Sequence, residues 1–143
     1  MNATPDDLGR FVDAQDSIYS RVIAELAVGA KQSHWMWFVF PQVEGLGNST
    51  MARRYAIASL AQAEAYLAHP MLGPRLRECT RLVLAVTGKS LPDILGAPDD
   101  VKFRSCMTLF DAVSPDDIFA EALARYCNGA RDPATLVFLQ RGN

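Results

Sequence analysis

Apolar residues recur along much of the chain at the three- and four-residue intervals that place them on one face of a helix. The clearest stripe follows Pro70 and alternates steps of four and three residues: Leu72, Leu76, Cys79, Val83 and Val86. A helix with this spacing has one apolar face that packs against the rest of the protein. The pattern therefore predicts a helix over residues 72–86.

Helix start signals precede most of the other apolar stretches. Side chains that can accept a hydrogen bond from the free N–H groups of a first helical turn indicate five starts: Thr4, Ser59, Ser90, Ser114 and Asp132. Pro98, which two aspartates follow, indicates a sixth. The segment that starts at Thr4 extends to Gly29, and Gly9 or residues 15–17 can kink or split it.

Residues 34–40 are the one stretch with the aromatic and β-branched composition of a strand. A single strand has no partner with which to form a sheet, so we expect a buried extended segment or a helix there. No internal repeat, linker or charge block divides the chain. The sequence therefore predicts an all-α protein: one multihelical globular domain over residues 1–143, with seven or eight helices rather than a simple four-helix bundle.

Size and composition are those of a folded domain. A chain of 143 residues can bury roughly two-thirds of the surface that it exposes when unfolded, which is enough for a self-sufficient core. Apolar residues make up 50% and charged residues 21%, which excludes a disordered or low-complexity protein. The net charge is −2, so we expect no general binding to nucleic acid.

Several features of the sequence as a whole indicate a cytoplasmic location. The N-terminus is acidic and has no apolar segment behind it, so a secretory signal is not expected. The longest apolar run, residues 35–40, is far shorter than the roughly 20 residues of a membrane span, and we expect no membrane association. The three cysteines are an odd number without a close-spaced pair, which argues against a disulfide framework and favours a reducing compartment. The two histidines do not form a metal-binding pattern, so no metal or cofactor is expected.

Residues 31–42 are the least ordinary stretch, because they hold both tryptophans, two phenylalanines and one of the two histidines. One interpretation is a central core element, since aromatic side chains dominate packing. In the other, a tryptophan faces a cleft as a stacking platform, while a lysine and a histidine supply charge and a titratable donor. This functional interpretation assigns ligand contacts to Lys31, His34, Trp35, Trp37 and Gln42.

A glycine-containing loop, residues 45–49, follows at once. Its glycines would let backbone amides approach an anion. However, the spacing matches neither the nucleotide-binding P-loop nor the dinucleotide fingerprint, so a loop that ends in a Ser49 helix cap is favoured. Arg53 and Arg54, just downstream, serve either an anionic ligand or an ordinary solvated helix face.

A second candidate group consists of Arg104, Ser105 and Thr108, which fall close together on one helix. A guanidinium and two hydroxyls on one face suit recognition of a phosphate or carboxylate, or equally a hydrogen-bonded contact between helices. Cys106 has no base near it in the sequence to activate it as a nucleophile. We expect the two candidate segments to meet in space and to form a ligand pocket.

Motifs along nearly the whole chain resemble those of one known family. They comprise residues 31–42 and shorter motifs at residues 10–12, 14–15, 45–47, 65–67, 69–70, 72–76 and 102–110. Together they closely resemble a bacterial family of unknown function, whose members are sometimes called calpastatin, a label that this sequence does not support. The resemblance implies a small, all-helical cytoplasmic protein. Cys106 stands where related sequences carry a small hydroxyl residue, which further weakens a catalytic role for this thiol.

Three functional hypotheses fit these observations. The first is a binding protein for a small anionic metabolite, such as a nucleotide or an ADP-ribose-like compound. The second is a hydrolase or N-glycosidase acting on such a compound, with His34 as the acid–base candidate. The third is an interaction or structural module in which the aromatic segment is core. A concave site with convergent polar groups would favour binding, a positioned base would favour catalysis, and a flat apolar patch would favour interaction.

Overall fold

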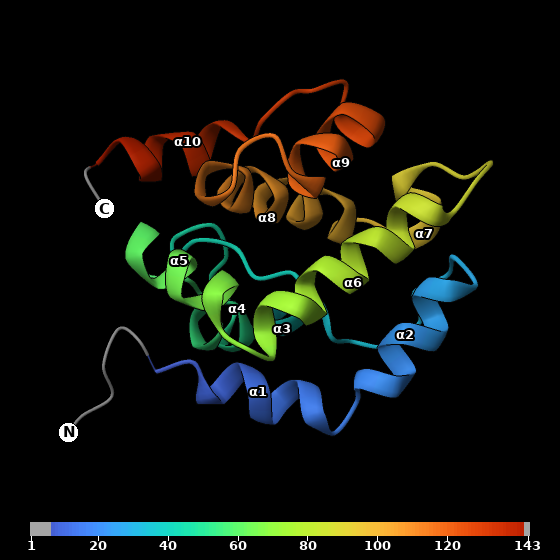
Figure 1. The fold of residues 1–143 in the computed structure, drawn as a ribbon, viewed down its shortest axis with the longest axis horizontal. Helices are drawn as coiled ribbons and strands as arrows, with labels where there is room; N and C mark the ends of the chain where they lie inside the picture. Colours follow the sequence, from blue (N-terminus) through green and yellow to red (C-terminus); the bar gives the residue numbers. More distant parts are fainter. Residues whose placement is uncertain (1–6, 142–143) are drawn as a thin grey trace.

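The computed structural model describes residues 7–141, and every regular element within that range is a helix (Figure 1). The described residues form ten helices: α1 (Gly9–Asp16), α2 (Tyr19–Ala27), α3 (Met36–Val39), α4 (Thr50–Arg54), α5 (Leu60–Ala68), α6 (Leu72–Ala85), α7 (Leu91–Leu95), α8 (Asp99–Val113), α9 (Ile118–Cys127) and α10 (Pro133–Gln140). The only β-type pairing among them is an isolated parallel bridge between Val43 and Ile57. The predicted all-α class is confirmed.

The helix number exceeds the expected seven or eight because α3 and α4 were not among the helices counted from the sequence. Helix α3 has four residues and α4 has five, so neither spans enough turns to show an apolar period in the sequence. Residues 34–40 are thus mainly helix rather than extended chain. The first helical segment is split at Ser17 and Ile18 into α1 and α2, while its predicted start at Thr4 lies outside the described residues.

Most predicted helix starts carry the expected caps. The Ser59 Oγ atom accepts a hydrogen bond from the Gln62 N–H at 3.0 Å, and Asp132 accepts one from the Thr135 N–H at 2.9 Å. The exception is Ser114, because α9 begins only at Ile118 and Asp117 is its N-cap. The Ser114 hydroxyl instead donates to the Asp117 carboxylate at 2.7 Å, so it supports the cap without being one.

Helix α8 is the central element of the packing. It contacts α5, α7, α9 and α10, and a continuous run of its residues, 105–111, is buried. In Figure 1, α9 and α10 lie along one side of α8 and α6 crosses the molecule beside it. The apolar stripe predicted on α6 is buried at Leu72, Leu76, Cys79 and Val83. Within residues 7–141, no helix is long and apolar enough to cross a membrane.

Candidate functional site

A single carboxylate, that of Glu25 on α2, shapes the start of the aromatic segment. It accepts hydrogen bonds from the backbone N–H groups of Gln32 and Ser33, from the Ser33 hydroxyl at 2.6 Å, and from the Trp35 indole N–H at 2.9 Å. Burial by itself would raise the pKa of Glu25, but these hydrogen bonds outweigh it and lower the pKa to about 2. Residues 32–35 are therefore held in one conformation by four charge-assisted hydrogen bonds.

Most aromatic side chains of this segment belong to the core. Trp35 and Phe40 are fully buried, and Phe40 packs edge-to-face against Phe103 of α8 with ring centroids 5.1 Å apart. Phe38 is also buried, whereas Trp37 is only half-buried. Core packing thus accounts for the environment of Trp35, and Trp37 is the tryptophan that reaches the surface.

The two charged or titratable candidates in this segment differ in their surroundings. The Lys31 ammonium lies 2.9 Å from the Asp99 carboxylate, donates to the Ser33 carbonyl, and sits over the Trp35 ring at 4.9 Å. Its side chain is only 6% exposed, so Lys31 forms a buried ion pair that ties the segment to the start of α8. His34, in contrast, is exposed and lies outside the two cavities described below.

On α8, two of the three candidate side chains hold the connection between α9 and α10. The Arg104 guanidinium donates to the carbonyls of Ala130 at 2.9 Å and Arg131 at 2.7 Å. The Thr108 hydroxyl donates to the Arg104 carbonyl and accepts from the Asp132 N–H. The geometry at these two residues is that of a contact between helices, one of the two interpretations open at the sequence level.

The two candidate segments nevertheless meet in space, as expected. Beside the Lys31–Asp99 pair, the Lys102 ammonium lies over the Trp37 ring at 5.2 Å and 3.7 Å from Asp99. Gln42 and Ser105 then line one cavity of about 400 Å³, together with Lys102. We call this cavity, bounded also by residues 46–49 and by Ala52, Pro98, Val101 and Asp132, the α8 hollow.

The glycine-containing loop forms a wall of the α8 hollow. Its base is closed by the bridge between Val43 and Ile57, in which the Glu44 N–H donates to the Ile57 carbonyl at 3.0 Å. Its end is the predicted cap, since the Ser49 Oγ accepts from the Ala52 N–H at 3.1 Å. Between them, Gly47 approaches α4 so closely that a Cβ there would lie 2.8 Å from that of Ala52. Glycine at this position therefore lets the loop lie flat against α4.

A second, larger cavity of about 690 Å³ lies at the same loop, and Gly47 and Asn48 line both cavities. Three arginines reach it: Arg10 of α1, Arg53 of α4, and Arg141, which follows α10. We call it the arginine cleft. Sequence reasoning identified Arg53 and the loop but missed Arg10 and Arg141. No local signal could have found these two, because the three arginines are far apart in the sequence.

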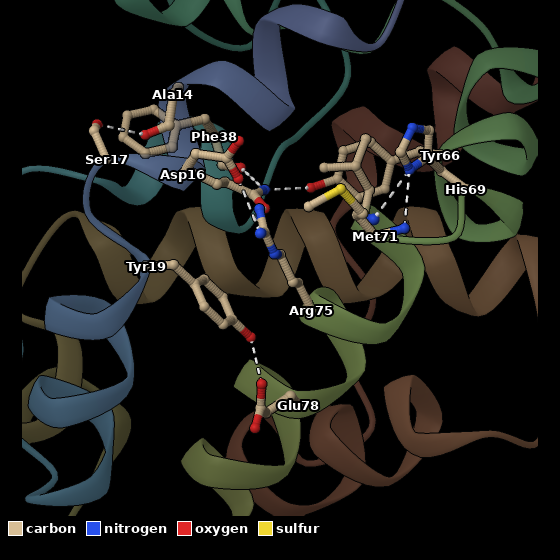
Figure 2. Close-up of polar contacts among 12 residues, drawn as sticks. Ala14, Asp16, Ser17, Tyr19, Phe38, Tyr66, His69, Met71, Arg75 and Glu78 are labelled. Atoms are coloured by element: carbon tan, nitrogen blue, oxygen red, sulfur yellow. Dashed lines mark hydrogen bonds and ion pairs between the residues drawn. The ribbon is translucent and has the colours of Figure 1, made fainter.

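A polar network that reaches the aromatic segment at Phe38 was also missed (Figure 2). Buried Gln15 donates to the Phe38 carbonyl at 2.7 Å and to the Tyr66 hydroxyl at 3.1 Å. Arg75 donates to the Gln15 side-chain oxygen at 3.3 Å and to Asp16 at 2.9 Å. Burial raises the pKa of Tyr66 well above its ordinary value, so its hydroxyl stays neutral. All these groups are satisfied within the protein, which indicates a structural network joining α1, α3, α5 and α6.

The thiols offer no activated nucleophile. All three cysteines are free, and Cys79 and Cys106 are buried. Burial raises the pKa of Cys79 to about 12 and that of Cys106 well above its ordinary value, so both are protonated at neutral pH. Within residues 7–141, no group of three or more His, Cys, Asp or Glu side chains is arranged to hold a metal ion.

Comparison with known proteins identifies similar proteins, but their descriptions name no activity. Residues 5–139 match the model of a family described as protein of unknown function, DUF1810. The chain is similar to the crystal structure of the conserved hypothetical protein Rv1873 from Mycobacterium tuberculosis, with 51% sequence identity and a TM-score of 0.93. The match covers 96% of this chain and 99% of the other. The search of curated proteins found no match.

Proposed function

The chain belongs to the DUF1810 family, whose function is unknown, and from its geometry we propose that the protein binds a small anionic metabolite in the α8 hollow. The observation that carries this proposal is that polar side chains from two separate segments line the same cavity. Gln42 ends the aromatic segment and Ser105 lies on α8, yet both line the same cavity. Buried or half-buried polar side chains that converge on one concave site are typical of small-molecule binding sites.

The residues that line the α8 hollow suit a ligand that has polar, apolar and anionic parts. The Gln42 amide can donate and accept, and the Ser105 hydroxyl donates to the Val101 carbonyl at 3.3 Å, which leaves its oxygen as an acceptor. Lys102 supplies a cation. Leu46, Ala52, Pro98 and Val101 supply apolar surface. A nucleotide or an ADP-ribose-like compound combines these features, because it carries hydroxyls, a planar ring and an anionic group.

The half-buried Trp37 ring lies next to the α8 hollow. It lies beside Lys102, and both residues line a small crevice with Gln42. Lys102 lies over one face of the ring, so stacking against a planar ligand group would use the other face. The aromatic segment thus contributes Trp37 and Gln42 to the proposed site, while Phe40 packs the segment against Phe103 of α8.

The test is a thermal-shift screen with nucleotides, ADP-ribose and sugar phosphates. We expect at least one compound to raise the melting temperature of the parent protein, and the Ser105→Ala and Gln42→Ala variants to lose most of that shift. Ser20→Ala and Gln32→Ala serve as matched controls, because both side chains are exposed away from the hollow. A parent protein that responds to no compound, or cavity variants that respond as fully as the controls, would overturn the proposal.

A further inference from the structure

The arginine cleft is distinct from the α8 hollow, although the same loop borders both. It is the larger of the two, at about 690 Å³ against about 400 Å³. Its walls come from α1, α4, the loop, the segment that precedes α5, and the end of α10. Phe138, a buried residue of α10, provides apolar surface in it. A cavity of this size can hold a drug-sized or nucleotide-sized molecule.

Among the described residues, no ion pair neutralises the arginines that line the cleft. Arg10, Arg53 and Arg141 line it, against the single carboxylate of Glu44. Among residues 7–141, the ion pairs are Lys31–Asp99, Lys102–Asp99, Arg75–Asp16, Arg77–Asp117 and Arg131–Asp111, and none of them includes a cleft arginine or Glu44. Three arginines that form no ion pair within the described residues therefore gather at one cavity of a chain whose net charge is −2. Such a cavity attracts anions.

Arg10 is held in place at the back of the cleft. Its guanidinium donates to the carbonyls of Asp7, Arg54 and Ala56, and it lies 4.5 Å from the centre of the Phe11 ring. Burial lowers the pKa of Arg10 below its ordinary value, an effect that the charge of Asp7 partly opposes. An anion in the cleft would offset the remaining cost of burying this cation. The guanidinium has five N–H donors, so a ligand can still reach those that the carbonyls leave.

The glycine-containing loop lines the same cavity, so its backbone N–H groups are further candidates for ligand contacts. Gly45 adopts a φ of +91°, and in the described part of the chain no hydrogen bond is donated by the N–H groups of residues 45–48. Gly45, Gly47 and Asn48 all line the cleft. Without Cβ atoms at the two glycines, a ligand can approach this backbone closely.

We propose that the arginine cleft is a binding site for a phosphate-bearing metabolite, which it holds by its phosphate group. The planar forks of Arg53 and Arg141 match the oxygens of a phosphate, and backbone amides add the further donors that a multiply charged group requires. Phe138 faces the part of the molecule that carries no charge. This inference does not depend on the proposed function, because the two proposals rest on different charged and polar side chains, although Gly47 and Asn48 line both cavities.

The experiment titrates the protein with inorganic pyrophosphate in low salt by isothermal titration calorimetry. We compare the parent with a double variant, Arg53→Gln with Arg141→Gln, whose two side chains are exposed and make no ion pair within the described residues. The matched control, Arg21→Gln with Arg81→Gln, makes the same charge change on the exposed surfaces of α2 and α6.

We expect one pyrophosphate per chain, an affinity at least about tenfold weaker in the cleft variant, and little change in the control. Three results would overturn the inference: no binding by the parent, an equal loss of affinity in the control, or citrate binding as tightly as pyrophosphate. The equal loss would show diffuse attraction to the whole surface, and the citrate result would show an unselective anion site. The nucleotide screen uses other variants, so either proposal can fail while the other stands.

Discussion

The aromatic segment and the arginine cleft differ in how their polar groups are satisfied. In the aromatic segment, one carboxylate accepts four hydrogen bonds and Lys31 is paired with Asp99. In the cleft, Arg53 and Arg141 have no such partner within residues 7–141. The more conspicuous sequence thus encodes mainly structure, and the less conspicuous one leaves two arginines without an ion pair in the described part of the chain. Unusual composition thus marks a structural constraint and does not by itself indicate a ligand site.

The largest expected effect is the loss of the Glu25 carboxylate. Glu25→Ala removes four charge-assisted hydrogen bonds and leaves the Trp35 indole N–H and two backbone N–H groups without their acceptor. We expect the free energy of unfolding to fall by about 3 kcal/mol or more, measured by urea denaturation. Glu64→Ala, an exposed change on α5, is the control and should have little effect. A Glu25→Ala protein as stable as this control would contradict the structural role of the segment.

Acid should weaken the same cluster by a smaller amount, because protonation removes the charge of Glu25 but keeps its atoms. The pKa of Glu25 in the folded protein is about 2, below its ordinary value of 4.5. The unfolded chain therefore takes up this proton first, so the stabilisation is complete above about pH 4.5 and is lost as the pH falls toward 2. The pKa of Asp117 is also lowered to about 2, so both groups contribute to acid unfolding.

Urea denaturation between pH 6 and pH 3 separates the two contributions. Glu25→Gln should show a shallower loss of stability with acid than the parent, because it no longer carries the depressed carboxylate. If the free energy of unfolding of this variant falls with pH as steeply as that of the parent, the acid sensitivity comes from Asp117 and other carboxylates alone.

The smallest expected effect is a difference between two arginines that undergo the same substitution. Arg104→Ala removes hydrogen bonds to the carbonyls of Ala130 and Arg131, so we expect a loss of about 1–3 kcal/mol in the free energy of unfolding. Arg53→Ala should change it by less than about 0.5 kcal/mol, since this side chain is exposed and unpaired within the described residues. Equal losses in the two variants, measured by thermal and urea unfolding, would remove the contrast between structural and available arginines.

The local structure of this protein could be read from the sequence where neighbouring residues decide it. The Ser59, Ser90 and Asp132 caps and the α6 stripe were predicted, because a cap needs only the next few backbone N–H groups and a stripe needs only periodic spacing. Ser114 was misplaced as a cap, because Asp117, three residues later, competes for the same role. The Ser49 cap of α4 was also predicted, whereas residues 34–40 were left open between extended chain and helix, because the four residues of α3 are too few to show a period.

The candidate site depended on the tertiary structure. The sequence alone indicated that residues 31–42 and the start of α8 are chemically unusual, and the fold brings Gln42 and Ser105 to one cavity. Only the packing of α1, α4 and α10 around the glycine-containing loop places Arg10, Arg53 and Arg141 together. Whether an arginine is paired depends on which distant carboxylates or carbonyls the fold brings within hydrogen-bonding distance. Sequence spacing carries no information about that distance, so the sequence determined the helices and the tertiary structure decided which charges remain free.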